Sequence, residues 1–122
     1  SYFYTMNIEH LRAFCLALPH TTEGFPFDED TLVFKVAGKM FCLASLQESD
    51  RINLKCDPEL AVQLREQYPC VLPGYHMNKK MWNTVIMDGS VPRTTLEQWI
   101  KHSYNLVVAG LPKKVQKELG FL

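Results

Sequence analysis

The sequence predicts an α+β domain of two layers, in which a five-stranded antiparallel sheet carries helices on one of its sides. Two observations lead to this fold class. Segments in which apolar and polar residues alternate, as in half-buried strands, occur between residues 31 and 56 and again between 71 and 87. Segments with apolar residues at helical spacing lie between and around them, which gives the order α-β-β-β-α-β-β-α-α.

The chain has 122 residues, a length that suits one domain with a core that needs no cross-links. We expect residues 7–122 to form this domain, and residues 1–6 to be a native extension or a remnant of cloning. The four cysteines show neither a CxxC pair nor a metal-ligand spacing, which favours reduced thiols, no metal and no cofactor. The chain lacks an apolar run of about 18 residues, so we expect no membrane span and a cytoplasmic location.

The first helix is expected to start after Asn7, whose side chain can cap it, and to stop before Pro19. Residues 20–30 contain Gly24, Pro26 and three consecutive acidic residues, a composition typical of loops. The sequence therefore predicts a loop between the first helix and the first strand.

Three strands of a meander are predicted next. The alternating stretches 31–37, 40–46 and 51–56 are separated by a tight turn at Gly38 and by the polar turn 47–50. One face of this part of the sheet is then apolar, and the other is partly basic. The residues expected on or beside the basic face are Lys35, Lys39, Arg51, Asn53 and Lys55.

A second helix is predicted over residues 57–68, because Asp57 can cap it and Pro58 fits its first turn. The stretches 71–77 and 81–87 then have the pattern of the two strands of a second hairpin. Together with the meander, this hairpin completes the expected five strands.

Two helices are predicted at the end of the chain. Thr94 and Glu97 have the spacing of a capping box, which predicts the start of a long helix there. Gly110 is expected to end this helix, and Pro112 to open a short last helix that reaches about Leu119.

Charge is distributed unevenly, although the formal net charge is zero. Residues 1–30 hold five acidic side chains and one basic, whereas residues 31–122 hold eight acidic and twelve basic. This distribution is compatible with one basic face, and equally with ordinary solvated surface. The neutral total counts against a dedicated nonspecific nucleic-acid binder, since such proteins are usually basic.

The segment from Gly74 to Val85 is the densest polar and aromatic stretch of the chain. Its two adjacent lysines could follow a phosphate backbone from the turn of the hairpin, and its aromatic rings could stack on bases. In the alternative interpretation the lysines solubilise a turn and protect an edge strand, while Trp82 packs in the core. The candidate contact residues are Tyr75, His76, Asn78, Lys79, Lys80, Trp82 and Asn83.

Signatures of an enzyme are absent from the sequence. The four histidines show no HExxH-type spacing, and the chain has neither a Walker loop nor a GxGxxG motif. A cysteine–histidine nucleophile pair has no local signature here either. We therefore expect a protein that is not an enzyme. A site for a small molecule would require a deep pocket lined by His76, Trp82 and His102.

Several stretches together resemble the MmcQ/YjbR family of small bacterial proteins. The most distinctive is the block from Pro73 to Val85, and the match extends from about Asn7 to Leu119. The other matching stretches are 31–36 with 38–41, 53–59, 102–107 and 111–114. The family typically has alanine where this chain has Cys42, which suggests that Cys42 serves packing rather than chemistry.

The resemblance implies a compact domain of the secretion-chaperone-like or double-wing class, with an antiparallel sheet and helices on one side. The family is commonly described as DNA-binding, and it offers no catalytic residues to carry over. We therefore expect a DNA-binding protein in which Lys79 and Lys80 contact phosphates and the basic sheet face extends the track. The alternative is a protein-interaction or chaperone-like domain that uses the same Tyr/His/Trp hairpin surface. Binding to DNA would weaken steeply with salt, and binding to a protein would depend on the aromatic rings.

Overall fold

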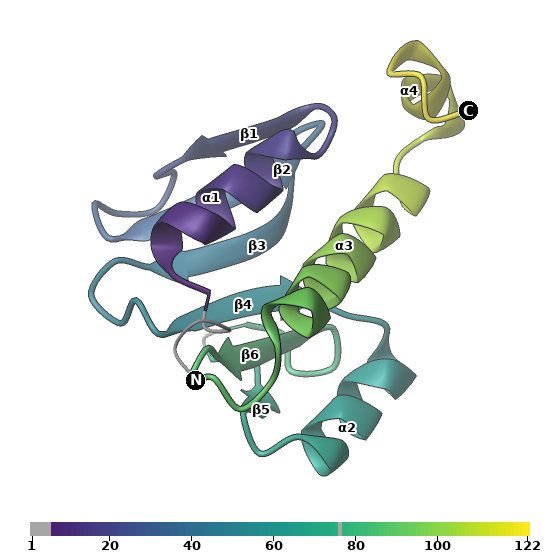
Figure 1. Cartoon of the computed structure of the whole chain (residues 1–122). Coiled ribbons are helices and arrows are strands. Elements are labelled where there is room, and N and C mark those ends of the chain that lie inside the picture. The colour runs from purple at the N-terminus through teal and green to yellow at the C-terminus, as the bar shows by residue number, and fades with distance from the viewer. Residues whose placement is uncertain (1–5, 76) are drawn as a thin grey trace.

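The computed structural model describes residues 6–75 and 77–122, so the expectations for residues 1–5 and for His76 lie outside the described residues. The α+β class, the antiparallel sheet and the placement of the helices on one side are confirmed (Figure 1). The sheet formed by the described residues has six strands instead of five. Met6, which the sequence assigned to the extension, is buried in the core.

All six strands belong to one sheet. They are β1 (Thr21–Gly24), β2 (Thr31–Val36), β3 (Lys39–Ser45), β4 (Arg51–Lys55), β5 (Val71–Pro73) and β6 (Trp82–Ile86). Their spatial order is β1-β2-β3-β4-β6-β5, and every neighbouring pair is antiparallel. The meander of β1 to β4 is thus extended by β6, and β5 forms the far edge.

The strand β1 occupies part of the stretch that the sequence predicted as a loop. Its four residues, Thr-Thr-Glu-Gly, contain no large apolar side chain and none is fully buried, so the strand shows no apolar alternation. Pairing with β2 along its whole length stabilises it as an edge strand. The Glu23 carboxylate also forms an ion pair with Arg12 of the first helix. These partners belong to other segments of the chain, which is why a local pattern does not reveal this strand.

The helices are α1 (Ile8–Ala17), α2 (Pro58–Gln67), α3 (Arg93–Ala109) and α4 (Lys113–Glu118). The predicted caps of the first two are confirmed: Asn7 Oδ1 accepts from the His10 N–H, and Asp57 Oδ2 accepts from the N–H groups of Glu59 and Leu60. The capping box at Thr94 is wrong, since α3 begins directly after Pro92 without a side-chain cap. No helix in the described part of the chain is both long and apolar enough to cross a membrane.

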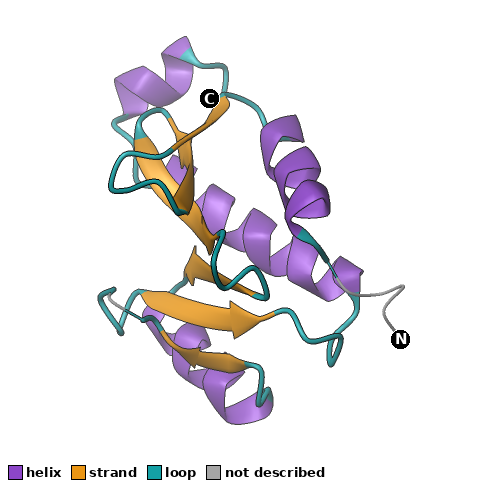
Figure 2. Ribbon diagram, turned by 90° about the vertical axis from the view of Figure 1, so that its left-hand side faces the viewer, coloured by secondary structure: helices purple, strands orange, loops and turns teal. Residues whose placement is uncertain are grey.

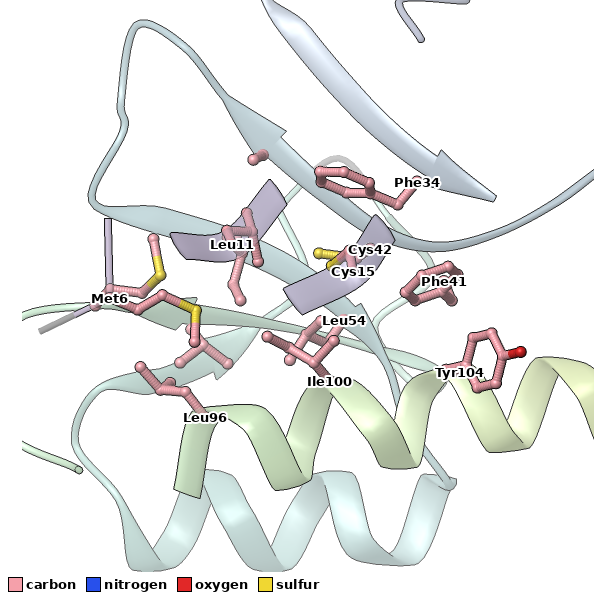
Figure 3. Packing of buried hydrophobic residues seen from close by; sticks show 14 of the residues in the cluster. Met6, Leu11, Cys15, Phe34, Phe41, Cys42, Leu54, Leu96, Ile100 and Tyr104 are labelled. Atoms are coloured by element: carbon pink, nitrogen blue, oxygen red, sulfur yellow. The ribbon is translucent and has the colours of Figure 1, made fainter. Parts of the chain in front are cut away.

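The main core lies between the sheet and the helices α1 and α3, where Figure 3 shows side chains from all three meeting. The pairing of β2 with β3 shifts between Phe34 and Lys35, because Phe41 is an extra residue in β3. This bulge lets Phe41 and Cys42 both be fully buried, next to Tyr104 and Cys15 respectively. The burial of Cys42 agrees with a packing role for its thiol.

Candidate functional site

The candidate residues lie mainly on the face of the sheet opposite the helices, called the outer face below. Side chains paired directly across antiparallel strands point to the same face, so the strand register identifies its members. One row crosses all six strands and consists of Gly24, Val33, Leu43, Asn53, Thr84 and Leu72. The row is apolar over β2 and β3 and polar over β4 and β6. This row across the middle of the outer face contains no basic side chain, so the basic residues of this face lie toward its two ends.

The described residues of the loop between β5 and β6, 74–75 and 77–81, fold over part of the outer face; this segment is called the 74–81 loop below. It buries a small second core of Val33, Leu43 and Trp82, on which Met40, Met77 and Met81 pack. The predicted strand 71–77 ends early, at Pro73. Only glycine fits next, because a Cβ on Gly74 would lie 2.9 Å from the Cβ and from the carbonyl oxygen of Trp82. The described part of this loop lies on the side of the sheet away from α3 in Figure 2.

Two of the predicted contact residues are buried. Trp82 is 8% exposed and belongs to the second core, and Asn83 is 2% exposed on the helix side of the sheet. Asn83 Nδ2 donates to the carbonyl of Ala61 at 3.3 Å, and Asn83 Oδ1 accepts from Arg65 Nη1 at 3.3 Å. Trp82 therefore anchors the 74–81 loop, and Asn83 ties β6 to α2.

The other described candidates in this loop, Tyr75, Asn78, Lys79 and Lys80, are exposed, but several are held by the loop itself. Lys79 Nζ donates to the Gly74 carbonyl at 3.0 Å, and Asn78 Oδ1 accepts from the Lys80 N–H at 2.9 Å. Tyr75 is 65% exposed, and its N–H donates to Thr84 Oγ1 at 2.9 Å. The side chains of Tyr75 and Lys80 are thus exposed without being held by the hydrogen bonds that fix Asn78 and Lys79.

Lysines lie along one end of the sheet, from the β1 edge past the turn between β2 and β3 to the loop that joins β5 and β6. The helix α4 docks at the same end, since the ring nitrogen Nε2 of His20 lies 2.8 Å from the Leu119 carbonyl oxygen and β1 starts directly after His20. We call this region the basic end. It contains Lys35, Lys39, Lys55, Lys79, Lys80, Lys113, Lys114 and Lys117. The three lysines of α4 were not among the predicted contacts, because their position depends on how the C-terminal segment packs.

Acidic side chains collect at the opposite end of the sheet, in the loops before β2 and before β4. We call this region the acidic end, and its carboxylates are those of Asp28, Glu29, Asp30, Glu48 and Asp50. Arg51 also lies here, with its Nε 3.5 Å from Glu48 Oε2 and 3.4 Å from Asp50 Oδ1. Arg51 and the lysines of the basic end are therefore at opposite ends of the strands and do not form one continuous track.

The pocket that a catalytic interpretation required is not formed by the described residues. Trp82 lies on the outer face, whereas His102 lies on the helix side, beside a cavity of only about 20 Å³ that Cys56 also lines. Burial raises the pKa of the Cys56 thiol to about 11, so the thiol stays protonated at neutral pH. His102 Nε2 accepts from the Asp57 N–H at 3.4 Å. Within the described ranges no three His, Cys, Asp or Glu side chains gather closely enough to hold a metal ion.

Known proteins are similar to this chain in sequence. The family model described as YjbR matches residues 16–106. YbdF of Escherichia coli O157:H7 is 40% identical over 112 residues, which cover 91% of this chain and 92% of YbdF. YjbR of Escherichia coli K12 is 33% identical over 115 residues, which cover 93% and 98% of the two chains.

Solved structures with a similar fold support the same relationship. The crystal structure of Deinococcus radiodurans protein DR2400, described with a DUF419 domain, superimposes with a TM-score of 0.89 at 43% identity and covers 95% of this chain and 89% of DR2400. A crystal structure of a Pseudomonas syringae protein gives a TM-score of 0.70 at 27% identity, over 83% of this chain and 98% of that one. The predicted resemblance is thus confirmed, and the chain belongs to the YjbR family.

Proposed function

We propose that this protein binds DNA through the phosphate backbone, without catalysing a reaction. The observation that carries the proposal is the basic end, where lysines of strands and turns lie along one end of the sheet and those of α4 lie at its β1 edge. Ammonium groups that replace the counterions of phosphates supply most of the affinity of backbone binding. The acidic end would be kept away from the phosphates, so the asymmetry also orients the protein on its ligand.

The geometry of the basic end suits contacts with a phosphate backbone. Lys35 and Lys55 lie on the outer face on β2 and β4, with β3 between them, so their backbones are roughly 10 Å apart. Among the described residues, neither these lysines nor Lys39 and Lys80 take part in an ion pair. The carboxylate of Asp57 is also near this end, but it caps α2. The lysine charges are therefore available to an anionic ligand.

The absence of a catalytic step and a cytoplasmic location are parts of the same proposal. The protonated Cys56 thiol and the half-buried position of His102, whose Nε2 accepts from the Asp57 N–H, support a binding role. All four cysteines are free and buried, which supports a reducing compartment.

The proposal predicts that neutralising the basic end weakens binding to DNA. The triple variant Lys39→Gln, Lys55→Gln, Lys80→Gln should bind a fluorescent 20-base-pair duplex less tightly than the unmodified protein at low salt. The negative slope of log K against log salt should become less steep, by about 0.9 for each phosphate that the protein no longer neutralises. Fluorescence anisotropy at several salt concentrations measures both quantities, and a single strand of the same sequence is compared in parallel.

Lys101→Gln provides the control, because Lys101 is an exposed lysine on the helix side of the molecule. This variant should retain the affinity and the salt slope of the unmodified protein. The proposal would be abandoned if neither the duplex nor the single strand bound at low salt, or if Lys101→Gln weakened binding as much as the triple variant.

A second candidate, a protein-interaction or chaperone-like domain, is favoured by one observation. Tyr75 and Leu72 are 65% and 40% exposed and lie together above Thr84 at the β5 edge of the outer face. If this surface binds a protein, we expect a partner to co-purify after nuclease treatment and at high salt. The Tyr75→Ala variant should lose this partner. Retention of the same partner by Tyr75→Ala would exclude this surface, and the Phe25→Ala variant is a control for a general loss of exposed aromatic area.

A further inference from the structure

A groove of about 540 Å³ lies on the outer face between the 74–81 loop and the acidic end. Its floor is formed by side chains of β2, β3, β4 and β6, and three loops form its walls. One wall is the loop before β2, the second is the turn before β4, and the third is the 74–81 loop. The volume lies in the range of about 300–1,000 Å³ that is typical of small-molecule sites. None of the lysines of the basic end is among the residues that line the groove.

Apolar and aromatic groups dominate the lining of this groove. Leu43, Met40 and Met77 contribute to its apolar surface. Phe27 and Tyr75 reach it from loops on different sides, and these rings are 62% and 65% exposed. Two large rings that remain this exposed beside a concave surface would become covered if a flat or apolar molecule lay between them.

The charge of the groove favours a cationic molecule. The lining contains the carboxylates of Asp28 and Glu48 and the guanidinium of Arg51. Arg51 is already matched by Glu48 and Asp50, as its distances above show. The carboxylate of Asp28 therefore remains as negative charge in excess.

Asp28 is fixed in place and kept ionised by its own loop. Its Oδ1 accepts from the N–H groups of Asp30 and Thr31 at 2.8 and 2.7 Å, and its Oδ2 accepts from the Thr31 hydroxyl at 3.2 Å. These bonds hold the pKa of Asp28 below its usual value. A negative charge thus stays at one wall of the groove over the whole neutral range.

We propose that this groove binds a small organic cation, namely a protonated amine carried on an aromatic or apolar body. The ammonium group would lie at the Asp28 carboxylate, and the body would lie on the apolar floor beside Phe27 and Tyr75, whose rings also attract cations. Asn53 adds a polar contact on the floor. Its Oδ1 accepts from the Thr84 hydroxyl at 2.5 Å, which leaves its Nδ2 to donate to an acceptor on the ligand.

Two probes of the same shape and opposite charge test the proposal. Tryptamine carries an ammonium on an indole, and indole-3-propionate carries a carboxylate on the same ring. In a titration of the full ¹⁵N-labelled chain followed by NMR, tryptamine should shift the amide signals of Thr31, Asn53 and Thr84. Indole-3-propionate should bind at least about tenfold more weakly, the difference expected for the loss of about 1.4 kcal/mol of charge attraction.

Three variants make the result specific to the groove. Asp28→Asn keeps an oxygen that can accept from the loop N–H groups but removes the charge, so tryptamine should bind several-fold more weakly. Tyr75→Ala should also weaken it. The matched control is Glu66→Gln, which removes an exposed carboxylate of α2 on the helix side and should leave the affinity unchanged.

The proposal is overturned if both probes bind equally or not at all, or if the shifted signals map outside the groove. It is also overturned if Asp28→Asn and Glu66→Gln have the same effect. The lysine variants of the basic end should leave tryptamine binding intact, so that a failure of DNA binding and a failure of this site are separate results.

Discussion

Replacing Trp82 with alanine is expected to lower the free energy of unfolding by about 3–5 kcal/mol, the usual effect of removing a buried aromatic side chain. Trp82 is 8% exposed and is the largest side chain of the second core, where it lies against Val33 and Leu43. Its removal would take away the surface on which Met77 and Met81 pack. The 74–81 loop should then lose its anchor, and Tyr75 would leave the wall of the groove.

Denaturant unfolding followed by circular dichroism measures this change. Tyr75→Ala is the matched control, because Tyr75 is a neighbouring aromatic residue that is largely exposed, and its effect should stay within about 0.5 kcal/mol. The loss of unfolding free energy in Trp82→Phe should lie between the losses in Trp82→Ala and Tyr75→Ala. A Trp82→Ala protein as stable as the Tyr75→Ala protein would show that Trp82 is a surface residue, as its assignment to the contact set implied.

Phe41→Ala is expected to destabilise the main core by a similar amount, about 3–5 kcal/mol. The Phe41 side chain is fully buried, and its ring packs edge-on against Tyr104 with centroids 5.4 Å apart. This contact joins the bulge of β3 to α3. The backbone carbonyl of Phe41 accepts from the Ser103 hydroxyl at 2.5 Å. The substitution keeps this carbonyl, so we expect the measured loss to report on the ring.

Thermal and denaturant unfolding of Phe41→Ala, Phe41→Leu and Phe25→Ala tests this prediction. Phe41→Leu should recover part of the loss because it refills most of the volume. Phe25 is 48% exposed, so Phe25→Ala should have little effect. Equal stability of the Phe41→Ala and Phe25→Ala proteins would contradict the packing of β3 against α3.

The parts of the fold that the sequence predicted are those with local signals. The strands β2, β3 and β4 have the expected alternation, and the caps at Asn7 and Asp57 require partners only two or three residues away. The strand β1 was missed because its stability comes from pairing with β2 and from Arg12. The false capping box at Thr94 shows the converse: the spacing was present, but the helix already begins at Arg93.

The candidate site was less predictable, because faces and ends of a sheet are defined by residues that are distant in sequence. Alternation shows which residues share a face, but it does not show that a loop will cover Trp82 or that α2 will bury Asn83. Pro73 and Gly74 did signal an irregular edge, and β5 ends there. The groove and the basic end each combine at least three separate segments, so neither appears in any single stretch of sequence.

The separation of basic and acidic ends gives the molecule a large electric dipole moment while its formal net charge is zero. Near neutral pH, two copies in solution therefore experience no overall repulsion, and the lysines of one copy attract the carboxylates of the next. Mobile ions screen such attractions within about 10 Å at 0.1 M ionic strength. We conclude that this protein should become more soluble, and its osmotic second virial coefficient more positive, as moderate salt is added to a dilute buffer.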